Sequence, residues 1–137
     1  LKPDPIVQNT LTGKIAKNQP YIFDICHLGQ MAEIKGVGIE FAFEVSSLIF
    51  GGVENWNSDE NLSNAAKKVG LDLIQLRESV TVHEDKIIEQ IKQNQVDQLN
   101  AGHHGVPLTV IGDKYFFGQD QFEKIMETLK ENGLKER

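Results

Sequence analysis

The sequence predicts an α/β protein rich in helices, in which a helical region leads into a C-terminal β-β-α unit. Across residues 21–101, apolar side chains recur mostly at the three- and four-residue spacing of amphipathic helices. Two short runs rich in β-branched and aromatic residues, 106–111 and 114–117, are then separated by a Gly-Asp pair typical of a β-hairpin turn. The last segment, 122–129, places apolar residues at i, i+3, i+4 and i+7, which predicts an amphipathic helix.

This pattern divides the chain into three regions. Residues 1–20 contain three prolines together with several Asn, Thr and Gly residues, so we expect an N-terminal arm there. Residues 21–101 form the expected helical subdomain, and residues 102–137 form the expected C-terminal β-β-α unit.

The first two helices are predicted from apolar spacing. One is expected from about Tyr21, although residues 21–25 taken alone also fit a short strand. Gly36 and Gly38 end this element. The segment 39–50 is dense in apolar residues and predicts a helix buried on most sides, although the alternation at its start also fits a strand.

Capping residues indicate where the next helices begin. Ser58 precedes two acidic residues, a favourable arrangement at the positive end of a helix dipole, and a short helix is expected after it. Asp72 is expected to cap the following apolar segment. Thr81 and Glu84 have the spacing of a capping box, so a long polar helix is expected over residues 84–101.

The composition excludes several classes of function. The chain has 137 residues, with 14 basic and 20 acidic side chains and a formal net charge of −6. This balance argues against non-specific nucleic-acid binding, which depends on a surplus of Lys and Arg. No apolar run approaches the ~20 residues of a membrane-spanning helix. No export signal is recognisable, so we expect a cytoplasmic protein with no membrane contact.

Cysteine and histidine give no strong catalytic or metal-binding motif. The single cysteine, Cys26, cannot form an intrachain disulfide or a C-x-x-C redox pair. It adjoins His27, but neighbouring residues on a helix point about 100° apart, so we expect a buried structural cysteine. The pair His103-His104 lacks a carboxylate at ligand spacing, which predicts a loop and no metal site.

The predicted hairpin has too few strands beside it. A two-stranded sheet is marginally stable by itself, and its unpaired edges need partners. The rest of the chain supplies at most one further strand, at residues 21–25. We therefore expect an incomplete sheet whose edge is bare, domain-swapped or paired with another molecule, including a second copy in a homodimer.

Two segments of the C-terminal unit carry a family resemblance. The segment 101–110, with Gly105-Val106-Pro107, and the segment 115–120, with Gly118-Gln119-Asp120, resemble the end of the DsbA-like thioredoxin-fold superfamily. The branch they resemble contains the 2-hydroxychromene-2-carboxylate isomerases and the kappa-class glutathione transferases. Residues 38–56 and 62–72 resemble the helical insertion of that branch, so the resemblance covers roughly residues 19–134.

The resemblance implies a thioredoxin-like domain interrupted by an all-helical subdomain, with residues 102–137 as its C-terminal part. It implies a cis peptide bond between Val106 and Pro107, in a loop that binds the thiol substrate. It also places Gln119 and Asp120 near the γ-glutamyl end of bound glutathione. Such proteins begin with a strand-helix-strand unit that carries a catalytic serine or cysteine. We therefore expect the nucleophile upstream of Leu1, in a longer protein.

The function implied by the resemblance is that of a thiol- or glutathione-dependent isomerase, transferase or oxidoreductase. Its expected partners are glutathione and a small-molecule thiol or thiol-bearing substrate. In this chemistry a nucleophile at a helix N-terminus is held as an anion by the helix dipole, while the proline loop orients the thiol substrate. The competing interpretation, from a different class, is a non-catalytic helical domain that mediates protein interactions.

Overall fold

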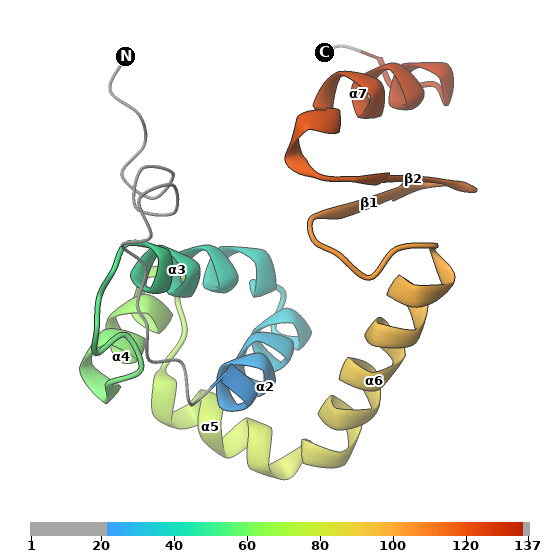
Figure 1. Ribbon diagram of the computed structural model, residues 1–137. Coiled ribbons are helices and arrows are strands. Elements are labelled where there is room, and N and C mark those ends of the chain that lie inside the picture. Colours follow the sequence, from blue (N-terminus) through green and yellow to red (C-terminus); the bar gives the residue numbers. More distant parts are fainter. Residues whose placement is uncertain (1–21, 136–137) are drawn as a thin grey trace, which may run out of the picture. The chain divides into compact units, whose positions relative to one another are not determined.

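The computed structural model describes residues 22–135, which form two compact units that divide between Gln90 and Ile91 (Figure 1). The first, here called the helical unit, consists of helices and their connections, and the second, the hairpin unit, contains an antiparallel strand pair and a C-terminal helix. The chain is therefore an α-rich α/β protein, as the sequence predicts. The expected N-terminal arm lies outside the described residues. No helix within residues 22–135 has both the length and the apolar content required to span a bilayer.

The helical unit is built from consecutive helices and the first part of a longer one. They are α2 (Ile22–Ile34), α3 (Gly38–Phe50), α4 (Asp59–Lys68), α5 (Leu73–Val82) and α6 (Glu84–Asn100), of which α6 continues into the hairpin unit. Residues 22–25 and 39–45, whose apolar pattern also fitted strands, are helical.

The helices of this unit pack in a closed set of pairs. Helix α2 contacts α3 and α5, and α4 contacts the same two helices. The core between them includes four large side chains with almost no exposed surface, Trp56, Phe41, Leu76 and Ile87. Burying an apolar side chain of this size stabilises the fold by about 1.5–3 kcal/mol. These buried side chains therefore hold the helices of the unit against one another.

The two predicted side-chain caps of α4 and α5 are confirmed. The Ser58 hydroxyl accepts a hydrogen bond from the Asn61 N–H at 3.2 Å at the start of α4. The Asp72 carboxylate accepts one from the Gln75 N–H at 2.9 Å at the start of α5. Each cap satisfies one of the N–H groups that a helix start leaves without an intrahelical acceptor.

The predicted capping box at Thr81 is wrong. Thr81 lies inside α5, and its hydroxyl donates to the Arg77 carbonyl at 3.1 Å. The chain passes from α5 into α6 at His83, whose N–H still donates to Ser79 and whose carbonyl already accepts from Ile87. A Thr hydroxyl can bond a carbonyl one turn back in its own helix, so the motif spacing alone does not identify a cap.

The hairpin unit has the predicted order of strand, strand and helix. Strands β1 (Leu108–Ile111) and β2 (Lys114–Phe117) pair antiparallel around Gly112, whose φ of +60° suits the first position of a tight hairpin turn. A 3₁₀ turn, η1 (Gln119–Gln121), leads into α7 (Phe122–Glu131), which packs on β1. Within the described part of the chain, the sheet consists of this strand pair.

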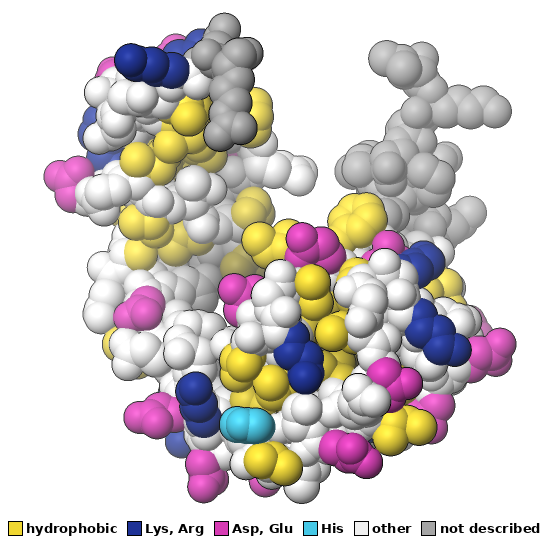
Figure 2. Space-filling view, turned by 180° about the vertical axis from the view of Figure 1, so that it is seen from behind, with side chains coloured by type: hydrophobic (Ala, Val, Ile, Leu, Met, Phe, Trp, Pro, Cys, Tyr) yellow, Lys and Arg dark blue, Asp and Glu magenta, His cyan; other side chains and the backbone are white. Residues whose placement is uncertain are grey.

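The molecular surface carries apolar as well as charged side chains. On the face drawn in Figure 2, hydrophobic side chains are exposed between scattered acidic and basic ones. Two of the largest exposed apolar side chains, Ile39 and Phe43, lie one turn apart on α3 and are 81% and 64% exposed. Helix α3 therefore presents an apolar stripe to the surroundings in the described structure.

Candidate functional site

One backbone hydrogen bond brings the predicted site residues close together. It lies at the open end of the hairpin, away from the turn. The Gly118 N–H donates to the Pro107 carbonyl at 3.0 Å. Val106 directly precedes Pro107, and Gln119 and Asp120 directly follow Gly118. Segments that are eleven residues apart in the sequence are thus joined at one point because the strand register brings them there.

Val106 and Pro107 are both exposed. The peptide bond between the two residues is cis, and the Val106 side chain is 78% exposed. Among residues 22–135, no group forms a hydrogen bond with the Val106 N–H or carbonyl. An exposed donor and acceptor on one residue form a ready point of attachment for an extended peptide backbone.

Asp120 lies in the η1 turn directly before α7, and not within the first turn of α7 itself. Its carboxylate lies close to Gly118: a Cβ at Gly118 would lie 2.6 Å from the Asp120 Oδ1. In the described structure this carboxylate has no hydrogen-bond or ion-pair partner, and both Gln119 and Asp120 are exposed. The charge is therefore available to a ligand.

The loop that leads into Val106 is fixed by aromatic stacking. The His103 ring stacks on Phe117 of β2, with ring centroids 3.9 Å apart, and His104 stacks on His103 at 5.1 Å. The Gly105 N–H donates to His103 Nδ1 at 2.8 Å, and the Gln98 side-chain amide donates to the Gly105 carbonyl at 3.1 Å. These contacts set the path of the backbone immediately before Val106.

Gly105 is required by the same packing. A Cβ at Gly105 would collide with Phe117 Cε2 and would lie 2.8 Å from His103 Cε1. The sequence analysis assigned the two histidines to a loop and missed this positioning role. The available signal was a pair of histidines flanked by glycines, close in sequence to a strand with three consecutive aromatic residues. No cluster of three or more metal-ligating side chains is present among the described residues.

The outer edge of β1 borders a groove within the hairpin unit. Because hydrogen-bonded pairs alternate along an antiparallel ladder, the bond between Gly118 and Pro107 implies that the backbone groups of Leu108 and Val110 point away from β2. A groove of about 390 Å³ lies along these residues and is also lined by Asn94, Asp97 and Gln98 of α6. The groove therefore combines free strand backbone with polar side chains.

Cys26 does not occupy the buried structural position that the sequence analysis expected. Its thiol is free and the residue is exposed. The buried face of α2 carries Leu28, Met31 and Ala32, and Cys26 lies about 160° around the helix from Leu28 at 100° per residue. The expectation failed because the apolar spacing of α2 is compatible with more than one buried face.

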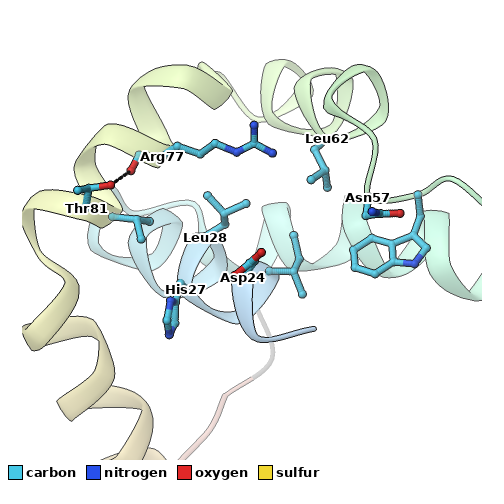
Figure 3. Close-up of a pocket in the computed structure, with 10 residues that line it drawn as sticks. Asp24, His27, Leu28, Asn57, Leu62, Arg77 and Thr81 are labelled. Carbon is cyan, nitrogen blue, oxygen red and sulfur yellow. Dashed lines mark hydrogen bonds between the residues drawn. The ribbon is translucent and has the colours of Figure 1, made fainter. Parts of the chain in front are cut away.

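A further hollow, of about 510 Å³, lies inside the helical unit and contains none of the four predicted site residues (Figure 3). Its lining comes from α2, α4, α5 and the segment before α4. Its residues are distant in the sequence, so spacing rules gave no signal for it.

Comparison with known proteins identifies the family. Residues 26–130 match the DSBA-like thioredoxin domain, which covers the helical region, the proline loop, both strands and most of α7. The chain therefore belongs to the DSBA-like thioredoxin domain family. No curated protein and no solved structure matches the chain.

Proposed function

We propose that this chain carries the thiol-substrate-binding part of an active site of the thiol–disulfide oxidoreductase, glutathione transferase or isomerase kind. The supporting observation is the hydrogen bond between Gly118 and Pro107, because it brings an exposed backbone segment and an unpartnered carboxylate to one place. Membership of the DSBA-like family supports thiol chemistry in general. The narrower assignment to glutathione chemistry, in the isomerase and kappa-class transferase branch, rests on the segments around Pro107 and Asp120.

In this proposal Val106 binds the cysteinyl part of the substrate. Its N–H and carbonyl pair with the backbone of an extended thiol peptide, as in β-strand addition, while Pro107 lies beside the thiol. The stacking of His103 on Phe117 and the hydrogen bond from the Gly105 N–H to His103 fix the position of this loop. The loop thus orients the thiol, and a cytoplasmic setting, where thiols are kept reduced, suits such a substrate.

Asp120 and Gln119 bind the γ-glutamyl end of glutathione in the same proposal. The Asp120 carboxylate accepts a charge-assisted hydrogen bond from the α-ammonium group, and Gln119 with nearby backbone N–H groups binds the α-carboxylate. These residues bind and orient the substrate and supply no nucleophile. The single thiol of the chain, Cys26, cannot cycle through an internal disulfide.

The decisive test is titration of reduced glutathione by calorimetry into the unmodified chain and its Asp120→Asn variant. A lost charge-assisted hydrogen bond costs about 1.5–3 kcal/mol, so we expect the affinity to fall by about 10-fold to 150-fold. Asp113→Asn is the matched control, because it removes the same charge from an exposed residue at the opposite end of the hairpin. It should leave the affinity unchanged.

Two outcomes would contradict the glutathione assignment. One is the absence of binding to the unmodified chain. The other is equal affinity of the Asp120→Asn variant together with a lower melting temperature, which would leave Asp120 with a purely stabilising role before α7.

We also propose that the free edge of β1 pairs with a strand from a second copy of the chain, giving a homodimer or a domain-swapped assembly. The outward backbone groups of Leu108 and Val110 and the adjoining groove support this partner. Val110→Pro removes an outward N–H but none of the bonds to β2. We expect it to shift the molar mass measured by light scattering from dimer to monomer. A monomeric unmodified chain would refute the pairing.

The competing function is a non-catalytic interaction domain, and the apolar stripe on α3 favours it. Exposed apolar side chains that gather on one helix face are typical of surfaces that bind a partner. Two results together would favour this alternative. Glutathione would not bind the chain, and a protein partner that binds the unmodified chain would not bind the Phe43→Ser variant.

A further inference from the structure

The hollow of the helical unit has the size and composition of a small-molecule site. Its volume of about 510 Å³ lies within the range of roughly 300–1,000 Å³ found for ligand pockets. It lies wholly within one compact unit, so its walls come from a single packed core. Neither the proposed thiol site nor the groove beside β1 shares a residue with it.

The apolar part of the lining is preformed. Leu28 of α2, Leu62 of α4 and Trp56 are buried core residues, and the partly exposed side chains of Ile25 and Val80 line the same space. An apolar side chain that enters this space therefore meets surfaces that are already ordered, so binding costs little reorganisation.

Two opposite charges line the same hollow as these apolar side chains. Figure 3 shows the Arg77 guanidinium entering from α5 and the Asp24 carboxylate entering from α2. Arg77 Nη1 contacts Asp59 Oδ1 at 2.7 Å, but the Asp59 side chain is 82% exposed, and exposed pairs of this kind are weak. The other guanidinium N–H groups remain free to bind an anion, and Asp24 has no partner among residues 22–135.

The charges select the type of ligand. A simple anion bound to Arg77 would also meet Asp24 and the nearby Asp59, and a simple cation bound to Asp24 would meet Arg77. A molecule that carries both charges close together offers an oppositely charged group to each of Asp24 and Arg77, which line the same hollow. The side-chain amide of Asn57, at the edge of the hollow in Figure 3, supplies a further donor and acceptor.

We propose that the helical unit binds a free α-amino acid with an apolar side chain. The α-carboxylate binds the Arg77 guanidinium, the α-ammonium group binds Asp24, and the side chain packs against the partly exposed Ile25 and Val80. This ligand site is independent of the proposed thiol site, so the failure of either proposal leaves the other standing.

Three matched probes test the proposal by titration calorimetry on the 137-residue chain. L-phenylalanine carries both charges, 3-phenylpropionate carries only the carboxylate, and 2-phenylethylamine carries only the ammonium group. We expect L-phenylalanine to bind about tenfold or more tightly than either of the others, because each of those lacks one charge-assisted contact.

Two variants then assign each charge to its residue. Arg77→Gln is expected to weaken L-phenylalanine binding at least about tenfold without weakening 2-phenylethylamine binding. Asp24→Asn is expected to weaken L-phenylalanine binding similarly without weakening 3-phenylpropionate binding. Lys68→Gln and Glu60→Gln are the matched controls, because both residues are exposed and lie outside the lining. Both controls should bind L-phenylalanine like the unmodified chain.

Circular dichroism spectra and melting temperatures establish that each variant is folded. For any variant that does not fold, the three-probe comparison on the unmodified chain decides the matter. Equal affinity for all three probes, or no binding of L-phenylalanine, overturns the proposal. So does a crossed pattern, in which Arg77→Gln weakens 2-phenylethylamine as strongly as L-phenylalanine.

Discussion

Replacing Gly118 with alanine perturbs the junction between β2 and the η1 turn in two measurable ways. Gly118 has φ of +101° and ψ of 158°, a backbone region that is essentially restricted to glycine. Holding an alanine there costs about 1–3 kcal/mol. We therefore expect the free energy of unfolding, measured by urea denaturation with far-UV circular dichroism, to fall by that amount.

The second effect of Gly118→Ala concerns ligand binding. The new Cβ would lie 2.6 Å from Asp120 Oδ1, so the carboxylate has to turn away from its present position. If Asp120 binds the α-ammonium group of glutathione, calorimetry should show an affinity loss of about tenfold, similar to that of Asp120→Asn. The double variant with both substitutions should bind glutathione no more weakly than Asp120→Asn alone. In that variant the side chain at position 120 has already lost its negative charge, so moving it removes no further charge-assisted contact.

Gly36→Ala separates the backbone cost from the contact with Asp120. Gly36 also has a positive φ, +84°, but a Cβ there would meet no atom within 4 Å. This control should lower stability by about 1–2 kcal/mol and leave glutathione binding unchanged. A Gly118→Ala variant as stable as the unmodified chain would refute the argument from backbone conformation. Unchanged glutathione affinity in that variant would refute the link to Asp120.

Three further substitutions test the described packing. Phe41→Ala should reduce the urea-unfolding free energy by about 3–5 kcal/mol, because it empties a fully buried site; a loss below about 1 kcal/mol would contradict that burial. Ser58→Ala should cost about 1 kcal/mol through the lost cap, whereas the exposed Ser46→Ala should cost much less, and equal losses would argue against the cap. Cys26→Ser should change the free energy of unfolding by less than about 0.5 kcal/mol. The Cys26 thiol should also react with a chromogenic disulfide reagent without denaturant. A thiol that reacts only after unfolding would contradict the exposure of Cys26.

The elements that the sequence predicts well are those determined locally. The caps at Ser58 and Asp72 and the tight turn at Gly112 depend on residues within one turn of each other, and all three occur. The boundary at Thr81 failed because the same hydroxyl can either accept from a backbone N–H as a cap or donate to a carbonyl one turn back, and the continuity of α5 into α6 decides between the two. Local rules find such a motif but do not rank its alternatives.

The candidate site was partly predictable for the same reason. The register set by the hairpin turn is enough to bring Pro107 next to Gly118 once the strands are known. The stacking of His103 on Phe117 requires the path of the loop, which no spacing rule contains. The exposure of Cys26 depends on which face of α2 meets α3 and α5, and this is a property of the packed helices and not of α2 alone.

The burial of Trp56 makes it an intrinsic fluorescence probe of the helical unit. It is the single tryptophan of the chain, and its side chain is 0% exposed within the helical unit. Indole emission therefore follows the environment of that unit, whereas far-UV ellipticity follows the backbone of both units. Coincident denaturation curves from the two signals would mean that the units unfold as one cooperative system, and separated curves would mean that each has its own transition.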